Sequence, residues 1–329
     1  MKSKVLLRKI DSYHLDPIEV FVRKSINLLQ NSHQLFSADK KVLLKPNLLR
    51  GFASEKCVTT HPILIEAVCR VLKDLGVSQI DLSDSPAIGS LPSVARKAGY
   101  SDLSKRYGVR IVPLSNPVPL ISEENIAHLK IAGNIREYDS IINLPKFKSH
   151  CQMTLTLSIK NLFGLVIGKR KPVLHCLVKN DKLTFGKMLI DIAKHVAPSL
   201  TIIDGIHAMQ GNGPINGTPY PLRLLAAGKD MTALDRVMTE IVNVPFDKLY
   251  TLEAAKIKNI QNEVAGQADI LLVPNLETGN ALSKIMVYFM GACAAGFIVG
   301  GKVPVVVTSR ADNVASRLAS IAASIIAAH

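Results

Sequence analysis

Short apolar segments that end in polar turn residues recur along the first 210 residues of the chain. Residues 41–47, Lys-Val-Leu-Leu-Lys-Pro-Asn, have the pattern of a short buried strand that ends in a Pro-Asn turn. Between His61 and Leu75 the apolar side chains recur at helical spacing, and Gly76 follows as a helix-ending residue. Further strand-like segments lie at residues 80–86, 109–113, 140–146 and 200–205. This alternation of strand and helix predicts an α/β fold with a mainly parallel sheet and crossover helices.

Polar residues follow several of these strands at the point where each strand ends. Because the loops after the strands of a parallel sheet gather at one edge, we expect their side chains to lie close together. These residues are Lys45, Asn47, Asp84, Lys146, Lys148, His150 and Asp204, and His61 opens the helix after the first turn.

Lys160 and Asn161 interrupt an apolar run at residues 157–164. A lysine in such a run must reach water, pair with a carboxylate or serve a ligand, because an unpaired buried ammonium is costly. Together with the lysines at the strand ends, it predicts an electropositive pocket with carboxylate counter-ions. Burial there can lower a lysine pKa far enough for proton transfer. Structural ion pairs and solvated lysines are the alternative interpretation.

Two apolar strand-like segments near the C-terminus also end in polar residues. These residues are Asn275, Glu277 and Asn280 after the first segment and Thr308, Ser309 and Arg310 after the second. The first group can enter the N-terminus of a helix, and the hydroxyl and guanidinium groups of the second can hold phosphate oxygens. Helix caps and a surface arginine are the alternative. A largely apolar helix at 315–328 can pack on a second copy of the chain as a homo-oligomer, or close the core of its own chain.

Composition favours a globular protein without a membrane span. The chain has 329 residues, 48% apolar and 20% charged, which is long enough for two domains or one large one. The N-terminus lacks the pattern of a signal peptide. The apolar window at 285–301, followed by Lys302 and the strand-like 303–307, fits a buried helix and strand better than a span. We therefore expect a cytoplasmic protein.

The five cysteines are far apart and form no CxxC pair, which argues against a zinc ribbon, an iron–sulfur cluster or a disulfide framework. Free thiols in a reducing compartment are expected instead. Asp84, Asp204, Asp230 and Asp235 have the chemistry to hold Mg²⁺ beside a phosphate, but no metal site is predicted from their spacing.

The positive charge of the chain is uneven. The whole sequence has 40 Lys/Arg and 26 Asp/Glu, of which six and five lie after residue 250, so the first 250 residues carry 34 and 21. Such a balance suits an anionic partner. Trp is absent and no nucleic-acid recognition motif is found, so a small anionic substrate is favoured over nucleic acid. The Gly/Asn/Pro-rich segment 209–219 lacks the GxxxxGK[ST] phosphate-binding pattern and fits a connection or lid equally well.

Several motifs in the first 250 residues occur in a fixed order. They are Leu44-Lys-Pro-Asn-Leu48, Thr59-Thr-His-Pro62, Asp84-Ser-Pro-Ala-Ile-Gly89, Asn143-Leu-Pro-Lys-Phe-Lys-Ser-His150, Ile159-Lys-Asn-Leu-Phe-Gly164, 204–214 and 227–235. Through them, residues 1–250 resemble the uncharacterised family called domain of unknown function 362. Many members of that family carry cysteine-rich ferredoxin-like segments, which this sequence lacks, so no iron–sulfur cluster is expected.

Residues 251–329 are similar to the C-terminal portion of phosphate acetyl/butyryltransferases. The similarity rests on Ala268-Asp-Ile-Leu-Leu-Val-Pro-Asn-Leu-Glu-Thr-Gly-Asn280 and Lys302-Val-Pro-Val-Val-Val-Thr-Ser-Arg-Ala-Asp312. It implies acyl exchange between coenzyme A and phosphate, with Ser309 and Arg310 at the acyl phosphate site. The N-terminal three quarters of such a transferase have no counterpart here.

Three functions follow as hypotheses. The first is an acyltransferase with coenzyme A as co-substrate, in which Ser309 and Arg310 work beside an anion-binding N-terminal domain. The second is an enzyme acting on a small anionic substrate through Lys45, Lys146, His150, Lys160 and Asn161. The third is an anion- or nucleotide-binding protein without catalysis.

Overall fold

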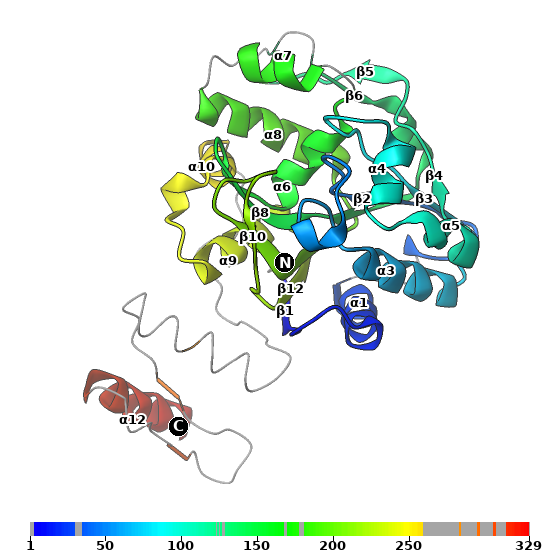
Figure 1. Ribbon diagram of the computed structural model, residues 1–329. Coiled ribbons are helices and arrows are strands. Elements are labelled where there is room, and N and C mark those ends of the chain that lie inside the picture. The colour runs from blue at the N-terminus through cyan, green and yellow to red at the C-terminus, as the bar shows by residue number, and fades with distance from the viewer. Residues whose placement is uncertain are drawn as a thin grey trace. The chain divides into compact units, whose positions relative to one another are not determined.

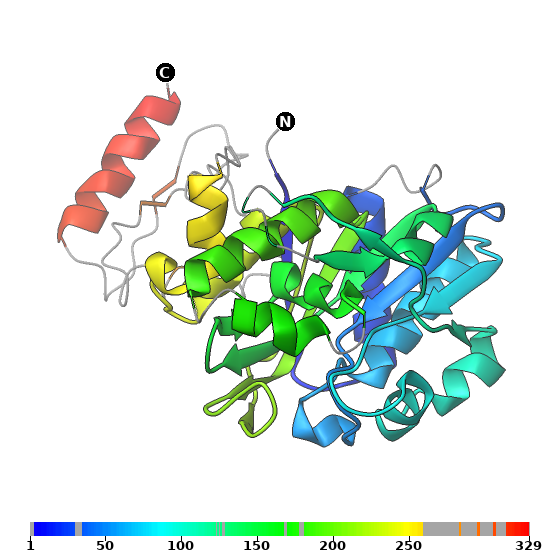
Figure 2. The ribbon, with the colours of Figure 1, turned by 90° about the horizontal axis from the view of Figure 1, so that it is seen from above.

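The computed structural model describes residues 3–29, 35–122, 124, 126, 129–167, 170–177, 181–258, 283, 295–296, 305–306 and 314–328. The chain divides into two compact units, Met1–Val273 and Pro274–His329. Figures 1 and 2 show the first unit as a twisted sheet with helices packed on both of its faces.

The described part of the first unit contains a ten-stranded sheet whose central path runs β1-β12-β10-β7-β2-β3-β4. The strands on this path are β1 (Val5–Lys9), β2 (Lys41–Pro46), β3 (Gln79–Leu82), β4 (Arg110–Ile111), β7 (Ser140–Leu144), β10 (Leu200–Gln210) and β12 (Leu224–Gly228). From β10 to β4 every neighbouring pair is parallel, whereas β12 runs antiparallel to both β10 and β1. The predicted α/β fold with a mainly parallel sheet is therefore confirmed.

Among the described residues, four helices cover one face of the sheet, and a second group covers the other. The first group is α1 (Leu15–Leu29), α3 (Pro62–Asp74), α4 (Leu91–Lys97) and α5 (Ser101–Tyr107). The second is α6 (Ser158–Asn161), α7 (Arg170–Leu177), α8 (Lys182–Val196), α9 (Met231–Ile241) and α10 (Tyr250–Ile257). Strand β2 shows how the sequence sets this layering, since Val42 and Leu44 join the first core and Leu43 joins the second. Lys45 continues the alternation and points to the same side as Leu43.

The segment expected as one strand at 140–146 is interrupted at Pro145, and a further strand, β8 (Lys146–His150), follows it. Proline has no backbone N–H to continue the ladder. The long strand β10 pairs first with β7 and then with β8, and the Asp204 N–H donates to the Pro145 carbonyl at 2.8 Å. Lys146, Lys148 and His150, which were expected among the polar residues after a strand end, thus lie on a strand of their own, and its lysines share one face.

The described part of the first unit also contains short strands and 3₁₀ helices. They are β5 (Pro117–Pro119), β6 (Lys130–Ala132), β9 (Thr154–Thr156), β11 (Thr218–Tyr220) and the 3₁₀ helices Ser54–Lys56, Gly133–Glu137, Leu162–Leu165 and Phe246–Lys248. Strand β9 pairs with β8, and β11 pairs with the far end of β10.

Helix α10 packs on α8 in the first unit and buries Ala254 and Ala255. In the second unit α12 (Val314–Ala328) corresponds to the helix expected at 315–328. No helix in the described parts of the chain is long and apolar enough to cross a membrane. Apart from residues 295 and 296, the apolar window at 285–301 lies outside the described residues.

Candidate functional site

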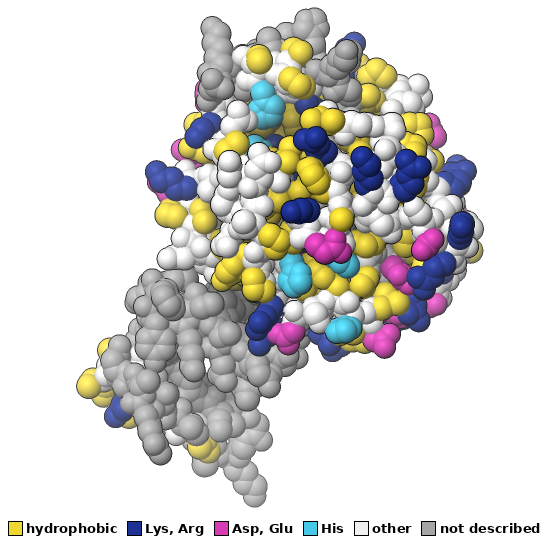
Figure 3. Space-filling model, viewed as in Figure 1, with side chains coloured by type: hydrophobic (Ala, Val, Ile, Leu, Met, Phe, Trp, Pro, Cys, Tyr) yellow, Lys and Arg dark blue, Asp and Glu magenta, His cyan; other side chains and the backbone are white. Residues whose placement is uncertain are grey.

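A cavity of about 1020 Å³ lies at the carboxyl edge of the parallel strands. The ends of β2, β3 and β8 reach it, and α6, α7 and the loop after β10 close its sides. Its charged and ionisable lining consists of Asp84, Lys148, His150, Cys151, Lys160, Lys171, His175 and Cys176. Figure 3 shows that Lys and Arg side chains gather on the upper half of one face of the first unit, whereas acidic side chains lie mostly below.

The floor of the cavity contains a buried ion pair. Lys45 Nζ lies 3.1 Å from Asp84 Oδ1, and both side chains are almost fully buried. Asp84 also accepts hydrogen bonds from the backbone N–H groups of Leu48 and Ser85, at 2.6 and 2.7 Å. A β-carbon at Gly164 would stand 2.2 Å from Asp84 Oδ1, so glycine is required where this backbone crosses the pair. The charge of Asp84 is therefore already matched inside the protein.

Asn161 joins the end of β2 to α6. Its Nδ2 group donates to the Lys45 carbonyl at 3.2 Å and to Asn143 Oδ1 at 2.8 Å, and its Oδ1 accepts from Asn47 Nδ2 at 2.9 Å. All three contacts are buried, where each unsatisfied polar group would be costly. Asn161 thereby fixes the position of the helix that carries Lys160.

Lys148 enters the cavity from β8. Its Nζ donates to Asn47 Oδ1 at 2.9 Å and to the Val58 carbonyl at 2.8 Å. An ammonium group has three N–H donors, and these two acceptors are its hydrogen-bond partners among the described residues, so one donor is left for a ligand there. Phe147 and Ser149 point to the other face of the strand, and Phe147 joins a hydrophobic core there.

Lys160 lies among aromatic rings. Its Nζ is 5.0 Å from the ring centroid of Phe163 and 5.4 Å from that of Phe185, and His175 stacks on Phe185 at 4.2 Å. Among the residues that the structure describes, no carboxylate or hydrogen-bond acceptor contacts the Lys160 ammonium. The side chain is only 9% exposed, and it lines the cavity. Within the part of the chain that the structure describes, an ammonium in this position lacks the kind of counter-ion that Lys45 has.

Burial and mutual repulsion weaken the basicity of the cavity groups. Burial, with the charge of Lys171 nearby, lowers the pKa of Lys160 to about 7. Burial and the charge of Lys160 lower the pKa of Lys148 to about 7, and burial lowers that of Lys171 to about 8. Burial also lowers the pKa of His150 to about 2 and that of His175 to about 4, so both imidazoles are neutral at pH 7.

Lys146 belongs to a different cluster. Its Nζ lies 2.9 Å from Asp204 Oδ2 and donates to the Tyr13 hydroxyl at 2.7 Å. Tyr13 donates to Asp204 Oδ1 at 2.6 Å, and its ring stacks on His61 at 3.5 Å. Burial lowers the pKa of His61 to about 4, and its Nδ1 accepts from Ile63 N–H as the N-cap of α3. Neither Lys146 nor His61 lines the cavity.

The predicted site residues therefore fall into three sets. Those that line or support the cavity are Lys45, Asn47, Asp84, Lys148, His150, Lys160 and Asn161. Those in the separate buried cluster are His61 and Lys146. Those outside the described residues are Asn275, Glu277, Asn280, Thr308, Ser309 and Arg310.

Two cavity groups were missed in the sequence. Lys171 and His175 lie on α7, and the Lys171 ammonium donates to the Ser85 carbonyl. Their spacing of four residues puts them on one face of a helix, which is the signal that could have found them.

The four aspartates whose chemistry suits Mg²⁺ have separate partners. Asp230 caps α9 and accepts from Ser3 Oγ at 2.6 Å, and Asp235 accepts from the Ser158 and Ile159 N–H groups at the start of α6. Asp84 and Asp204 form the two ion pairs above. Within the described residues, no group of three or more His, Cys, Asp or Glu side chains is placed to hold a metal ion.

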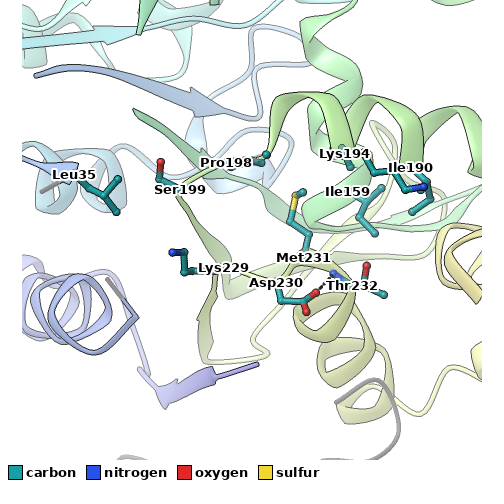
Figure 4. A pocket seen from close by; sticks show the side chains of 12 residues that line it. Leu35, Ile159, Ile190, Lys194, Pro198, Ser199, Lys229, Asp230, Met231 and Thr232 are labelled. Atoms are coloured by element: carbon teal, nitrogen blue, oxygen red, sulfur yellow. Dashed lines mark hydrogen bonds between the residues drawn. The ribbon is translucent and has the colours of Figure 1, made fainter. Parts of the chain in front are cut away.

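A second cavity of about 470 Å³ lies at the opposite edge of the sheet (Figure 4). Its lining includes Ile159, Ile190 and Met231, with Lys194 and Lys229 around them. The carboxylate there belongs to Asp230, which already caps α9. This cavity therefore has fewer ionisable side chains that could act on a ligand than the cavity at the carboxyl edge.

Comparison with known proteins gives matches to two families. Residues 42–240 match the family described as "Domain of unknown function (DUF362)", and residues 244–327 match "Phosphate acetyl/butaryl transferase". Both resemblances drawn from the sequence are confirmed.

Individual relatives cover the chain unevenly. A thylakoid-associated protein of Synechocystis sp. is 37% identical over 254 residues, which are 77% of this chain and 78% of the relative. A phosphate acetyltransferase of Rhizobium meliloti is 53% identical over 77 residues, which are 23% of this chain and only 24% of that enzyme. A solved Thermotoga maritima structure aligns with a TM-score of 0.41 at 12% identity, covering 68% of this chain and 57% of its own.

Proposed function

The chain belongs to the DUF362 family, and on that premise we propose that the cavity at the carboxyl edge of its first unit binds a small anionic substrate and exchanges a proton with it through Lys160. The observation that carries the proposal is the Lys160 ammonium, which reaches a cavity of about 1020 Å³ without a counter-ion among the described residues.

The charges around the cavity support an anionic ligand. Lys148, Lys160 and Lys171 line it, and Asp84, the carboxylate in the same lining, is already paired with Lys45. An anion that carries a carboxylate or phosphate group would neutralise part of this excess and accept charge-assisted hydrogen bonds. The nearby apolar lining of Leu49, Phe163 and Ile215 suits a substrate with a short apolar portion.

The residues of the cavity would have separate roles. Lys171 and the unused donor of Lys148 bind the anionic group. Lys160, whose pKa is about 7, accepts or donates the proton, because a group with a pKa near the working pH is present in both forms. Asn47 and Asn161 hold Lys148 and α6 in place.

Calorimetric titration with oxalate tests the binding step. We expect saturable binding to the native chain. Oxalate has two carboxylates, and the one that faces Lys160 loses a charge-assisted contact in Lys160→Met, so binding should weaken there by about tenfold or more. Lys24→Met, which removes an exposed lysine on α1, is the control and should bind oxalate like the native chain. Equal affinity in the native chain and Lys160→Met would refute the proposed site.

Hydrogen exchange on carbon separates an enzyme from a binding protein. In D₂O, proton NMR of 2-oxobutyrate should show faster loss of the methylene signal with the native chain than with Lys160→Met. Binding of oxalate together with no exchange on this acid, or on other small carboxylic acids, would favour the non-catalytic anion-binding alternative.

A second candidate function rests on the C-terminal segment. Its 53% identity to part of a phosphate acetyltransferase favours acyl exchange between coenzyme A and phosphate, with Thr308, Ser309 and Arg310 holding the phosphate and Asn275, Glu277 and Asn280 beside it. In this organisation residues 1–250 and 251–329 are two modules, and the first supplies an anion-binding surface.

Phosphate-dependent release of thiol from acetyl- or butyryl-coenzyme A should then occur, and Arg310→Ala should abolish it. Absence of thiol release by folded chain would exclude this activity and leave the cavity proposal untouched.

A further inference from the structure

We propose that the Lys160 amine is a nucleophile that forms an imine with the carbonyl group of a small oxo acid. The inference rests on the anion-binding function proposed above and narrows its substrate class to carboxylic acids that carry a ketone or aldehyde.

The surroundings of Lys160 differ from those of the other buried lysines in the same region. Lys45 and Lys146 each pair with a carboxylate, and Lys148 donates to two oxygen acceptors. Lys171 donates to the Ser85 carbonyl. Lys160, by contrast, contacts aromatic faces and has no acceptor among the described residues. With respect to the described residues, its amine therefore has no hydrogen bond to break before it reacts.

An amine attacks a carbonyl only in its neutral form. Two arrangements favour that form, an apolar enclosure and a neighbouring cation. Lys160 has both, because it is buried beside Phe163 and Phe185 and Lys171 is the nearby charge that most opposes its protonation. The same cation remains available to hold a carboxylate once the substrate is bound, since Lys171 lines the same cavity.

The reaction conserves atoms and charge without another reactant. The amine nitrogen forms a bond to the carbonyl carbon, and the carbonyl oxygen takes a proton from the nitrogen to give a carbinolamine. That hydroxyl takes the second proton of the nitrogen and leaves as water, and a C=N bond replaces the C=O bond. The neutral imine becomes cationic when its nitrogen takes up a proton from water. The cationic imine withdraws electrons from the C=N carbon, which makes the protons on the next carbon of the acid exchangeable.

The volume and charge of the cavity limit which oxo acids can bind. A volume of about 1020 Å³ admits an oxo acid with several carbons. The carboxylate would lie against Lys148 and Lys171, and the carbonyl would face Lys160. The neutral imidazoles of His150 and His175 line the same space and add no charge that competes for the carboxylate.

Borohydride trapping tests the inference directly. The full chain is incubated with pyruvate or 2-oxobutyrate, reduced with sodium borohydride, digested and examined by mass spectrometry. We expect a reduced adduct on the peptide that contains Lys160, and no adduct there in Lys160→Arg, while Lys24→Met is modified like the native chain. Because the site is mapped on the native chain, the result does not depend on the folding of any variant.

A second variant tests the carboxylate contact. In Lys171→Met the pyruvate concentration needed for half-maximal trapping should rise about tenfold. Trapping of the uncharged ketone acetone should weaken less, because acetone loses only the effect of Lys171 on the Lys160 pKa and no carboxylate contact. Oxalate binding measured on the same preparation distinguishes the two proposals. Binding of oxalate without an adduct on Lys160, or an adduct spread over many lysines, overturns the imine alone. Absence of both binding and adduct overturns the anion site as well.

Discussion

Gly186 on α8 lies so close to the carbonyl group of Tyr250 on α10 that a β-carbon at Gly186 would stand 2.4 Å from the carbonyl oxygen. The two residues fall within matches to different families, Gly186 in the DUF362 match and Tyr250 in the transferase match. Helix α10 nevertheless packs in the first compact unit. Segments that match two different families therefore pack in one hydrophobic core.

Gly186→Ala should destabilise the first unit, because the added methyl group meets backbone that cannot move independently of α10. We expect a loss of about 1–3 kcal/mol in the free energy of unfolding, measured by urea denaturation of the full chain. His195→Ala, at an exposed position of the same helix, should stay within about 0.5 kcal/mol of the native chain. A native-like Gly186→Ala would mean that α10 is not fixed against α8.

Asp84→Asn should cost about 3 kcal/mol in unfolding free energy, because it leaves the buried Lys45 ammonium without its carboxylate. Thermal and urea denaturation provide the measurement. The double variant Lys45→Met, Asp84→Asn should recover part of the loss, since it leaves no unpaired charge. If the loss of unfolding free energy in the double variant equalled the sum of the losses in Lys45→Met and Asp84→Asn, the two side chains would not act as a pair.

Oxalate affinity should fall as pH rises from about 6 to about 9. Lys148 and Lys160, with pKa values of about 7, and Lys171, with a pKa of about 8, are charged below these values and neutral above them. Oxalate keeps both charges across this range, so the change belongs to the protein. Bound oxalate stabilises the protonated lysines. The fall in oxalate affinity therefore occurs at a higher pH than the pKa values of the free protein alone would give. Calorimetry at several pH values should show a dissociation constant about tenfold higher at the upper end, and a shallower dependence in Lys160→Met.

Tyr13→Phe should lower stability without weakening oxalate binding. It removes the hydroxyl that donates to Asp204 and accepts from Lys146 and His207 N–H, at a cost of about 1–3 kcal/mol. This cluster does not line the cavity. Loss of oxalate affinity comparable to that of Lys160→Met would show instead that the two clusters are one site.

Local signals explain which parts of the fold could be predicted. Helix α3 was expected at residues 61–75 and spans Pro62–Asp74, because its apolar spacing and its capping residues lie within the segment itself. Strand β8 was missed because residues 146–150 place lysine and histidine on one face and have no run of apolar residues. Strand β8 pairs with the nearby β9 and with β10, and its partner residues in β10 lie more than fifty residues away in the sequence, so short-range patterns carry no trace of that second pairing.

The different partners of Lys146 and Lys148 could not be predicted for a related reason. Lys146 and Lys148 share one face of β8, yet Lys146 pairs with Asp204 and Lys148 contacts Asn47. The pairing of β8 with β10 shifts in register between Asp204 and Met209, which separates the surroundings of the two side chains. Sequence spacing alone predicts a common direction for both and does not give the partner that each one meets.

The three contacts of Asn161 have an evolutionary consequence. One amide side chain serves Lys45, Asn143 and Asn47 at once, through both of its polar atoms. A single substitution at Asn161, Asn143 or Asn47 leaves a buried donor or acceptor unmatched on another segment of the chain. These positions should therefore show strong epistasis, so that in descendants of this sequence they persist together or are replaced together, while neighbouring apolar positions drift independently.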